Sequence, residues 1–111
     1  MEKLRIAIPT KGRDGLEDAV SEVFGRANTF TIIDIEGKKI KNVEVIQNPA
    51  ASYKHGAGPV VVKTLTDLGV NTIIASEFGP GVSTLLEHFN VAKVEVKSDT
   101  RVAEAIRRFL E

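Results

Sequence analysis

Cysteine is absent from this chain of 111 residues, and histidine occurs only twice, as His55 and His88. Without cysteine the protein has no disulfide, no cysteine nucleophile, no thiolate zinc site and none of the thiolate ligands that usually hold iron–sulfur clusters. Any metal chemistry must therefore use histidine, carboxylate or backbone groups.

An excess of charge of either sign is also lacking, and so is any long hydrophobic run. Fifteen lysines and arginines balance fifteen aspartates and glutamates, which leaves a formal net charge of zero and no bulk field to attract nucleic acid or an anionic membrane. No apolar stretch approaches the roughly 20 residues of a membrane span, and the first residues lack a signal-peptide pattern. We expect a cytoplasmic protein whose partners include neither nucleic acid nor membrane.

The length predicts a single domain over residues 1–111 with one continuous core. Runs of apolar and β-branched residues predict strands near residues 4–8, 29–35, 40–46, 70–75 and 91–96. Apolar residues at helical spacing predict three helices, which begin near residues 60, 82 and 102.

Particular residues mark the expected ends of these elements. Pro9 is expected to end the first strand, and Gly25 is typical of a helix C-terminus. Gly69 is expected to close the first long helix, and Ser98 or Asp99 to cap the start of the last one.

The order of the elements predicts a three-layer α/β/α domain with a mixed sheet of about five strands, one of them antiparallel. Right-handed crossovers place the first strand at the centre, the hairpin on one side and the two later strands on the other. Ligands of such sheets bind beyond the carboxyl ends of the parallel strands. The loops after Ile8, before Val60 and after Ala75 are therefore expected to meet in one crevice.

The segment His55-Gly56-Ala57-Gly58-Pro59 leads directly into a predicted helix and is the first candidate for a binding site. The unpaired N–H groups and the positive dipole end of a helix N-terminus favour an anion. The same turn is also what an ordinary chain reversal produces, since one Gly-x-Gly turn is a weak motif.

Two other loops carry groups that suit an anion. Arg26 offers a guanidinium fork for a carboxylate or phosphate, and the amides around Gly79 precede another helix. Glu77, in the same loop as Gly79, would oppose an anion if it faced the site. Lys11 and Arg13 follow the first strand, either as cations for a ligand or as parts of a solvated turn.

Several common chemistries find no support in the residues. The Walker and dinucleotide-binding glycine patterns are missing, and no serine stands in Gly-x-Ser-x-Gly. The first strand, with Ile6, Ala7 and Ile8, offers no acid for a two-metal nuclease. His88 is interpreted as a surface or packed histidine, so no catalytic machinery is evident.

Four segments in this order, IAIPT, VSEVFGRA, NPAASYKHGAGP and EFGPG, resemble the dinitrogenase iron-molybdenum cofactor biosynthesis family. The match spans nearly the whole chain, and small stand-alone archaeal and bacterial members of that family have about this length. The resemblance implies a ribonuclease H-like fold and a relationship to proteins that carry or insert the iron–molybdenum cofactor or its precursors. It also implies His55 as a metal ligand. The residues predicted to bind the cofactor are Arg26, His55, Gly56, Ala57, Gly58 and Gly79.

The sequence departs from the family pattern at two places. Val23 stands where many relatives have histidine, and residues 76–81 read SEFGPG where relatives often have GNIGPN. One metal-facing group is therefore gone, and the carboxylate of Glu77 has entered.

The leading hypothesis is a non-enzymatic carrier or accessory protein that holds an anionic iron–sulfur or iron–molybdenum-type cluster, or a precursor, and exchanges it with donor or acceptor proteins. The alternative is a binder, enzyme or sensor for a small phosphorylated or carboxylated metabolite, using the same amides with Lys11 or Arg13. A third interpretation is an interaction domain whose hairpin edge pairs with a partner or a second copy. The oligomeric state does not follow from the sequence.

Overall fold

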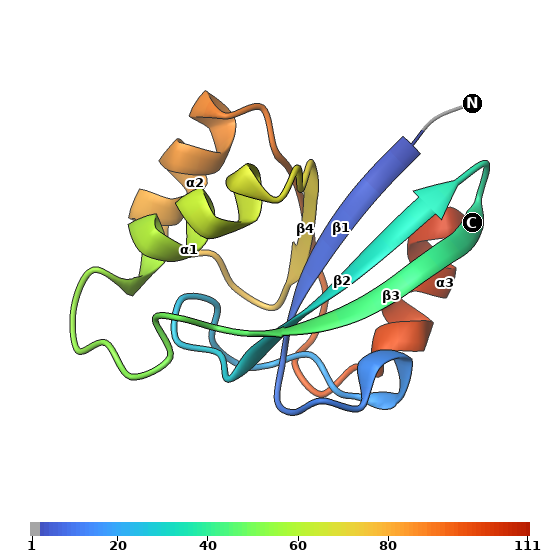
Figure 1. Cartoon of the computed structure of the whole chain (residues 1–111), viewed down its shortest axis with the longest axis horizontal. Coiled ribbons are helices and arrows are strands. Elements are labelled where there is room, and N and C mark those ends of the chain that lie inside the picture. Colours follow the sequence, from blue (N-terminus) through green and yellow to red (C-terminus); the bar gives the residue numbers. More distant parts are fainter. Residues whose placement is uncertain (1–2) are drawn as a thin grey trace.

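The computed structural model describes residues 3–111, which form a five-stranded sheet with helices on both faces (Figure 1). The predicted three-layer α/β class is thereby confirmed. The elements in chain order are β1 (Lys3–Thr10), the short 3₁₀ helix η1 (Gly15–Glu17), β2 (Thr29–Glu36), β3 (Lys39–Gln47), α1 (Ala57–Asp67), β4 (Thr72–Ala75), α2 (Pro80–His88), β5 (Ala92–Glu95) and α3 (Val102–Leu110).

The sheet has the strand order β3-β2-β1-β4-β5. Strand β2 runs antiparallel to β1 and β3, whereas β1 pairs in parallel with β4, and β4 with β5. The predictions of one antiparallel strand, a central first strand and a hairpin on one side are confirmed. The carboxyl ends of β1, β4 and β5 therefore lie at one edge of the sheet, where the loops of the candidate site begin.

Two apolar layers hold the helices to the sheet. Phe30 and Ile73 are fully buried in the layer under α1 and α2, and Ile33 and Ile74 are fully buried in the layer under α3. Consecutive strand residues point to opposite faces, which explains why Ile73 and Ile74 belong to different layers. Strand β4 is buried on both faces, as expected for an inner parallel strand.

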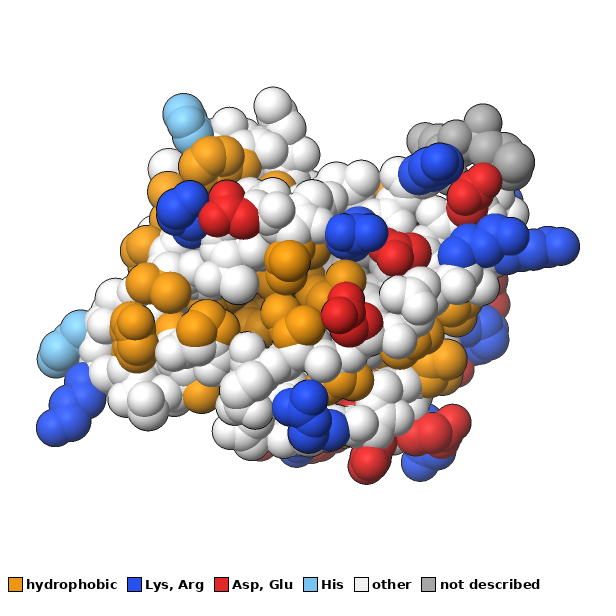
Figure 2. Space-filling model, in the orientation of Figure 1, with side chains coloured by type: hydrophobic (Ala, Val, Ile, Leu, Met, Phe, Trp, Pro, Cys, Tyr) orange, Lys and Arg blue, Asp and Glu red, His pale blue; other side chains and the backbone are white. Residues whose placement is uncertain are grey.

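The layer formed by α1 and α2 covers the hairpin less completely than it covers β1 and β4. Apolar side chains line a trough between these helices and the hairpin (Figure 2). Phe30, Val61 and Leu65 are fully buried there, and Ile46 of the edge strand β3 packs against the same apolar layer. No helix among residues 3–111 is both long and apolar enough to cross a bilayer.

The prediction that Pro9 ends the first strand is wrong, because β1 continues to Thr10. Strand β1 pairs with β4 only at Ile6 and Ala7. Pro9 lies beyond this pairing, so the backbone N–H that proline lacks is not needed for a hydrogen bond to β4. The carbonyl of Pro9 accepts a hydrogen bond from the N–H of Ser21 at 2.8 Å instead.

Two predictions about helix ends are also wrong. The segment around Gly25 contains no helix, so Gly25 is not a C-cap. Helix α3 has Arg101 at its N-cap rather than Ser98 or Asp99. Asp99 has a φ of 67° and its carboxylate pairs with Lys11, which keeps this side chain away from the helix.

The expected end of the first long helix is confirmed, but its start lies earlier than predicted. Gly69 has a φ of 82°, and its N–H donates to the carbonyl of Thr66 at 3.0 Å. The N–H of Val70 donates to the carbonyl of Leu65 at 3.0 Å, which completes a Schellman motif. Helix α1 begins at Ala57.

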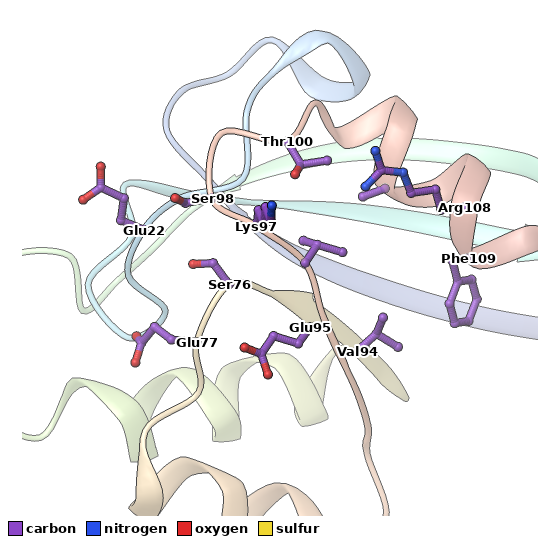
Figure 3. Close-up of a pocket in the computed structure, with 12 residues that line it drawn as sticks. Glu22, Ser76, Glu77, Val94, Glu95, Lys97, Ser98, Thr100, Arg108 and Phe109 are labelled. Atoms are coloured by element: carbon purple, nitrogen blue, oxygen red, sulfur yellow. The ribbon is translucent and has the colours of Figure 1, made fainter.

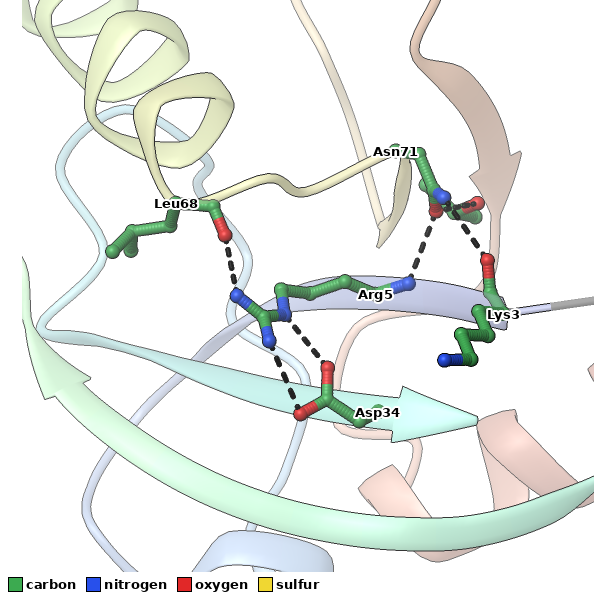
Figure 4. A network of polar contacts seen from close by, with 6 residues as sticks. Lys3, Arg5, Asp34, Leu68 and Asn71 are labelled. Atoms are coloured by element: carbon green, nitrogen blue, oxygen red, sulfur yellow. Dashed lines mark hydrogen bonds and ion pairs between the residues drawn. The ribbon is translucent and has the colours of Figure 1, made fainter. Parts of the chain in front are cut away.

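Arg5 of β1 ties the end of α1 to the hairpin (Figure 4). Its Nε donates to Oδ1 of Asp34 on β2 at 2.7 Å, and its Nη1 donates to the carbonyl of Leu68 at 2.6 Å. The hydrogen bond with Asp34 raises the pKa of Arg5, so the guanidinium stays charged. Helix α1 is therefore anchored at the end opposite the candidate site.

Candidate functional site

Three loops at the carboxyl edge of the sheet line an open cavity of about 290 Å³. The loop after β1 contributes residues 23–26, the loop before α1 contributes residues 54–58 with the first turn of the helix, and the loop after β4 contributes residues 77–79. Val82 of α2 completes the lining. The predicted meeting of these three loops is confirmed.

The structure brings all six predicted cofactor-binding residues to this cavity. They are Arg26, His55, Gly56, Ala57, Gly58 and Gly79. Lys11 and Arg13 do not line it: Lys11 pairs with Asp99, and Arg13 donates to Oε1 of Gln47 at 3.3 Å. The two cations of the metabolite hypothesis are therefore engaged elsewhere.

Two helix N-termini border the cavity. Gly56 and Gly79 are the N-cap residues of α1 and α2, with φ values of 75° and 73°, and neither helix has a side-chain cap. The first N–H groups of a helix have no acceptor within the helix, and the helix dipole adds positive potential at the same place. Ala57 and Gly58 of α1 and Val82 of α2 line the cavity. The backbone alone thus favours an anion here.

Glycine lets the three loops approach one another closely. A Cβ on Gly58 would lie 2.7 Å from Cγ2 of Val82, and a Cβ on Gly25 would lie 3.1 Å from the backbone nitrogen of Gly58. These close approaches leave no room for a side chain at Gly58 and little room for one at Gly25.

Charged side chains of both signs surround the opening. Arg26, Lys54 and His55 line the cavity and are exposed, and within residues 3–111 none of the three takes part in an ion pair. Glu77 is the one carboxylate in the lining, and its Oε1 accepts a hydrogen bond from the N–H of Phe24 at 3.2 Å. The two cations, Arg26 and Lys54, outnumber the carboxylate, although Glu77 weakens their field.

Aromatic side chains form the apolar part of the lining. The ring of Phe24 is 1% exposed and meets Phe30 edge to face, with ring centroids 5.6 Å apart. The ring of Phe78 lies 6.2 Å from that of Phe24. Val23 also lines the cavity and is 42% exposed, so the first of the two positions noted as departures from the family pattern faces the site.

A site for a bare metal ion is not evident. No group of three or more histidine, aspartate or glutamate side chains within residues 3–111 could hold one. His88 ends α2, whereas His55 lies in the loop before α1 and alone of the two lines the cavity.

A larger groove of about 1230 Å³ adjoins this cavity and was not predicted from the sequence. Glu77 lines both hollows. The carboxylates of Glu22 and Glu77 lie at one end of the groove, and Arg108 and Phe109 of α3 lie at the other (Figure 3). The groove runs beside β5, which is only four residues long and mostly exposed, and no local pattern in the sequence indicated it.

Comparison with known proteins places this architecture in a family. The family described as "Dinitrogenase iron-molybdenum cofactor" matches residues 2–111. An uncharacterized protein of Methanocaldococcus jannaschii is 32% identical over 108 residues, which cover 97% of this chain and 86% of that protein.

Solved structures agree with this match. The apo form of the orange protein from Desulfovibrio gigas has a TM-score of 0.85 and 28% identity, and the alignment covers 96% of this chain and 86% of that one. A putative NifB protein from Thermotoga has a TM-score of 0.78 and 40% identity, with the same shares covered. The resemblance noted in the sequence is confirmed, and the chain belongs to the dinitrogenase iron–molybdenum cofactor family.

Proposed function

We propose that this protein is a non-enzymatic carrier or accessory protein, which holds an anionic iron–sulfur or iron–molybdenum-type cluster, or a precursor, in the cavity of about 290 Å³. The observation that carries the proposal is the meeting of two uncapped helix N-termini with Arg26 and His55. The family, which is named for the iron–molybdenum cofactor, supports the same class of cargo.

Each part of the lining has a role in this proposal. His55 ligates a metal at the edge of the cluster, and the amides of Ala57 and Gly58 donate hydrogen bonds to its anionic surface. Arg26 supplies a countercharge. The apolar walls formed by Phe24 and Phe78 suit a soft sulfide surface better than a strongly hydrated phosphate.

The exposure of the site supports transfer of the cargo. His55 and Arg26 are both exposed, so the outer face of a bound cluster stays open to donor and acceptor proteins. The lining holds one imidazole and one carboxylate but no serine or cysteine nucleophile, which favours carriage over catalysis.

A small phosphorylated or carboxylated metabolite is the alternative ligand, because uncapped helix N-termini also favour such anions. A panel of phosphates and carboxylates without metal tests it. A ligand of this class raises the melting temperature according to its concentration and dissociation constant, whereas a silent panel counts against the alternative.

Substitution of His55 tests the cluster proposal. Wild-type protein mixed anaerobically with a synthetic thiolate-ligated [4Fe–4S] cluster, or with iron–molybdenum cofactor, is expected to retain metal in stoichiometric amount after gel filtration. His55→Ala is expected to weaken retention by about 10-fold or more, since outer-sphere changes alone often cost that much. Elemental analysis measures the metal.

The matched control is His88→Ala, which removes an exposed imidazole outside the cavity and is expected to leave retention unchanged. Unchanged retention by folded His55→Ala would remove His55 from the site. No retention by the wild type would refute the cluster proposal and make the metabolite panel decisive.

Substitution of Glu77 tests the sign of the charge on the cargo. Glu77→Gln keeps an oxygen for the N–H of Phe24 but removes the negative charge from the lining. The affinity for the [4Fe–4S] cluster is expected to rise by about two- to tenfold at low salt, and less at high salt. Absorbance titrations at two ionic strengths measure this. Glu22→Gln, in the larger groove only, is the control, and an equal gain in both variants would contradict a local effect.

A further inference from the structure

Asn48 is a buried polar residue that lies outside the lining of the cavity. Its side chain is 3% exposed and bonds only to backbone groups. Nδ2 donates to the carbonyl of Gly25 at 3.0 Å and to that of Ala27 at 2.8 Å, and Oδ1 accepts from the N–H of Ala50 at 2.9 Å. Asn48 therefore connects the loop before α1 with the loop after β1.

Arg26 lies between the two carbonyls that Asn48 binds. The guanidinium of Arg26 is exposed and has no ion pair among residues 3–111, so no side-chain partner fixes its position. Its position depends on the backbone of its own loop. On the other side of that loop, Gly25 lies so close to the first turn of α1 that a Cβ would meet the nitrogen of Gly58 at 3.1 Å.

The two carbonyls depend on this one amide group. Among the described residues no other side chain donates to the carbonyl of Gly25 or of Ala27. A partly buried carbonyl that loses its donor is unfavourable, so the loop would shift until water reached it. Such a shift would change the position of Arg26 relative to the helix N-termini.

We propose that Asn48 is a positioning residue of the anion site, which acts on ligand affinity by holding Arg26 at the rim of the cavity. The inference rests on the proposed function and extends it to a residue that does not touch the ligand. It requires that the contribution of Asn48 to binding disappear when Arg26 has no charged side chain.

A double-mutant cycle tests this requirement with the synthetic thiolate-ligated [4Fe–4S] cluster as the probe. Asn48→Ala and Arg26→Ala are each expected to weaken binding by about 10-fold. The double variant is expected to bind no more weakly than Arg26→Ala alone, because the position of the loop no longer matters once the guanidinium is gone. If Asn48 had only a structural role, the fold-losses in affinity of the two single variants would instead multiply in the double variant.

Asn28→Ala is the matched control, since Asn28 is an exposed asparagine at the end of the same loop and its Nδ2 donates to the carbonyl of Lys11. It is expected to bind like the wild type. Circular dichroism checks that each variant is folded. If Asn48→Ala is unfolded, Asn48→Ser, which keeps a hydroxyl donor, takes its place in the cycle.

The outcomes separate the two proposals. Multiplying losses, or wild-type affinity in the folded Asn48 variant, would overturn the role of Asn48 and leave the proposed function standing. Failure of the wild-type protein to bind the cluster would overturn the proposed function and the role of Asn48 with it.

Discussion

Phe24→Ala is expected to lower the free energy of unfolding by about 3–5 kcal/mol and to abolish binding at the cavity. The Phe24 ring is 1% exposed, packs edge to face against Phe30, and also lines the candidate site. Its loss removes buried apolar contacts and leaves a void directly behind the loop of Arg26. One substitution therefore affects both the core and the site.

Urea unfolding with an unchanged m-value measures the loss of stability. Phe89→Ala is the control, because Phe89 is 49% exposed and its removal is expected to change stability by only about 0.5 kcal/mol. A loss below about 1 kcal/mol for Phe24→Ala would show that the packing around this ring is looser than the structure indicates.

Gly58→Ala is expected to destabilise the protein by about 1–3 kcal/mol, although alanine is the better helix former. The added Cβ would lie 2.7 Å from Cγ2 of Val82, a distance that real Cβ atoms essentially never show. Val82 cannot yield easily, because β-branched side chains in helices have one strongly preferred rotamer. The N-termini of α1 and α2 must therefore move apart, which widens the cavity.

Thermal and urea unfolding compare this variant with Gly81→Ala, which introduces the same methyl group in α2, where the described structure places no atom within 4 Å apart from chain neighbours and the helix's own backbone. Gly81→Ala is expected to be neutral or to stabilise by up to about 1 kcal/mol. In the double variant Gly58→Ala with Val82→Ala, removal of the clash is expected to make the two costs less than additive. Full additivity would contradict a direct clash.

The strands and the strand-to-helix loops could be predicted because their signals are local. β4 is a short, fully buried run of β-branched and small residues, TIIA, and Gly69 takes the positive φ that a helix end of this type needs. The segment with His55 precedes a helix, so the site could be placed at a helix N-terminus before its neighbours were known. These signals also placed Gly79 near His55 through the expected topology.

The remaining features depend on contacts between residues far apart in the sequence. Gly25 looked like a helix end, but its loop takes its shape from Asn48 and Glu77, whose bonds reach back to residues 24–27. Asp99 has the side chain of a typical helix cap, but its carboxylate instead accepts a hydrogen bond from Lys11, which is 88 residues away in the sequence. The larger groove arises because α3 leaves part of β5 uncovered, which no local pattern encodes.

Helix α1 has unequal ends. Its C-terminus is closed by Gly69 and held by Arg5, whereas its N-terminus at Gly56 has no side-chain cap. Local opening in a native protein starts where fewest interactions must break. Fraying of α1 is therefore concentrated in the turn with Ala57 and Gly58, and a ligand bound there would slow amide exchange at this end of the helix far more than at the other.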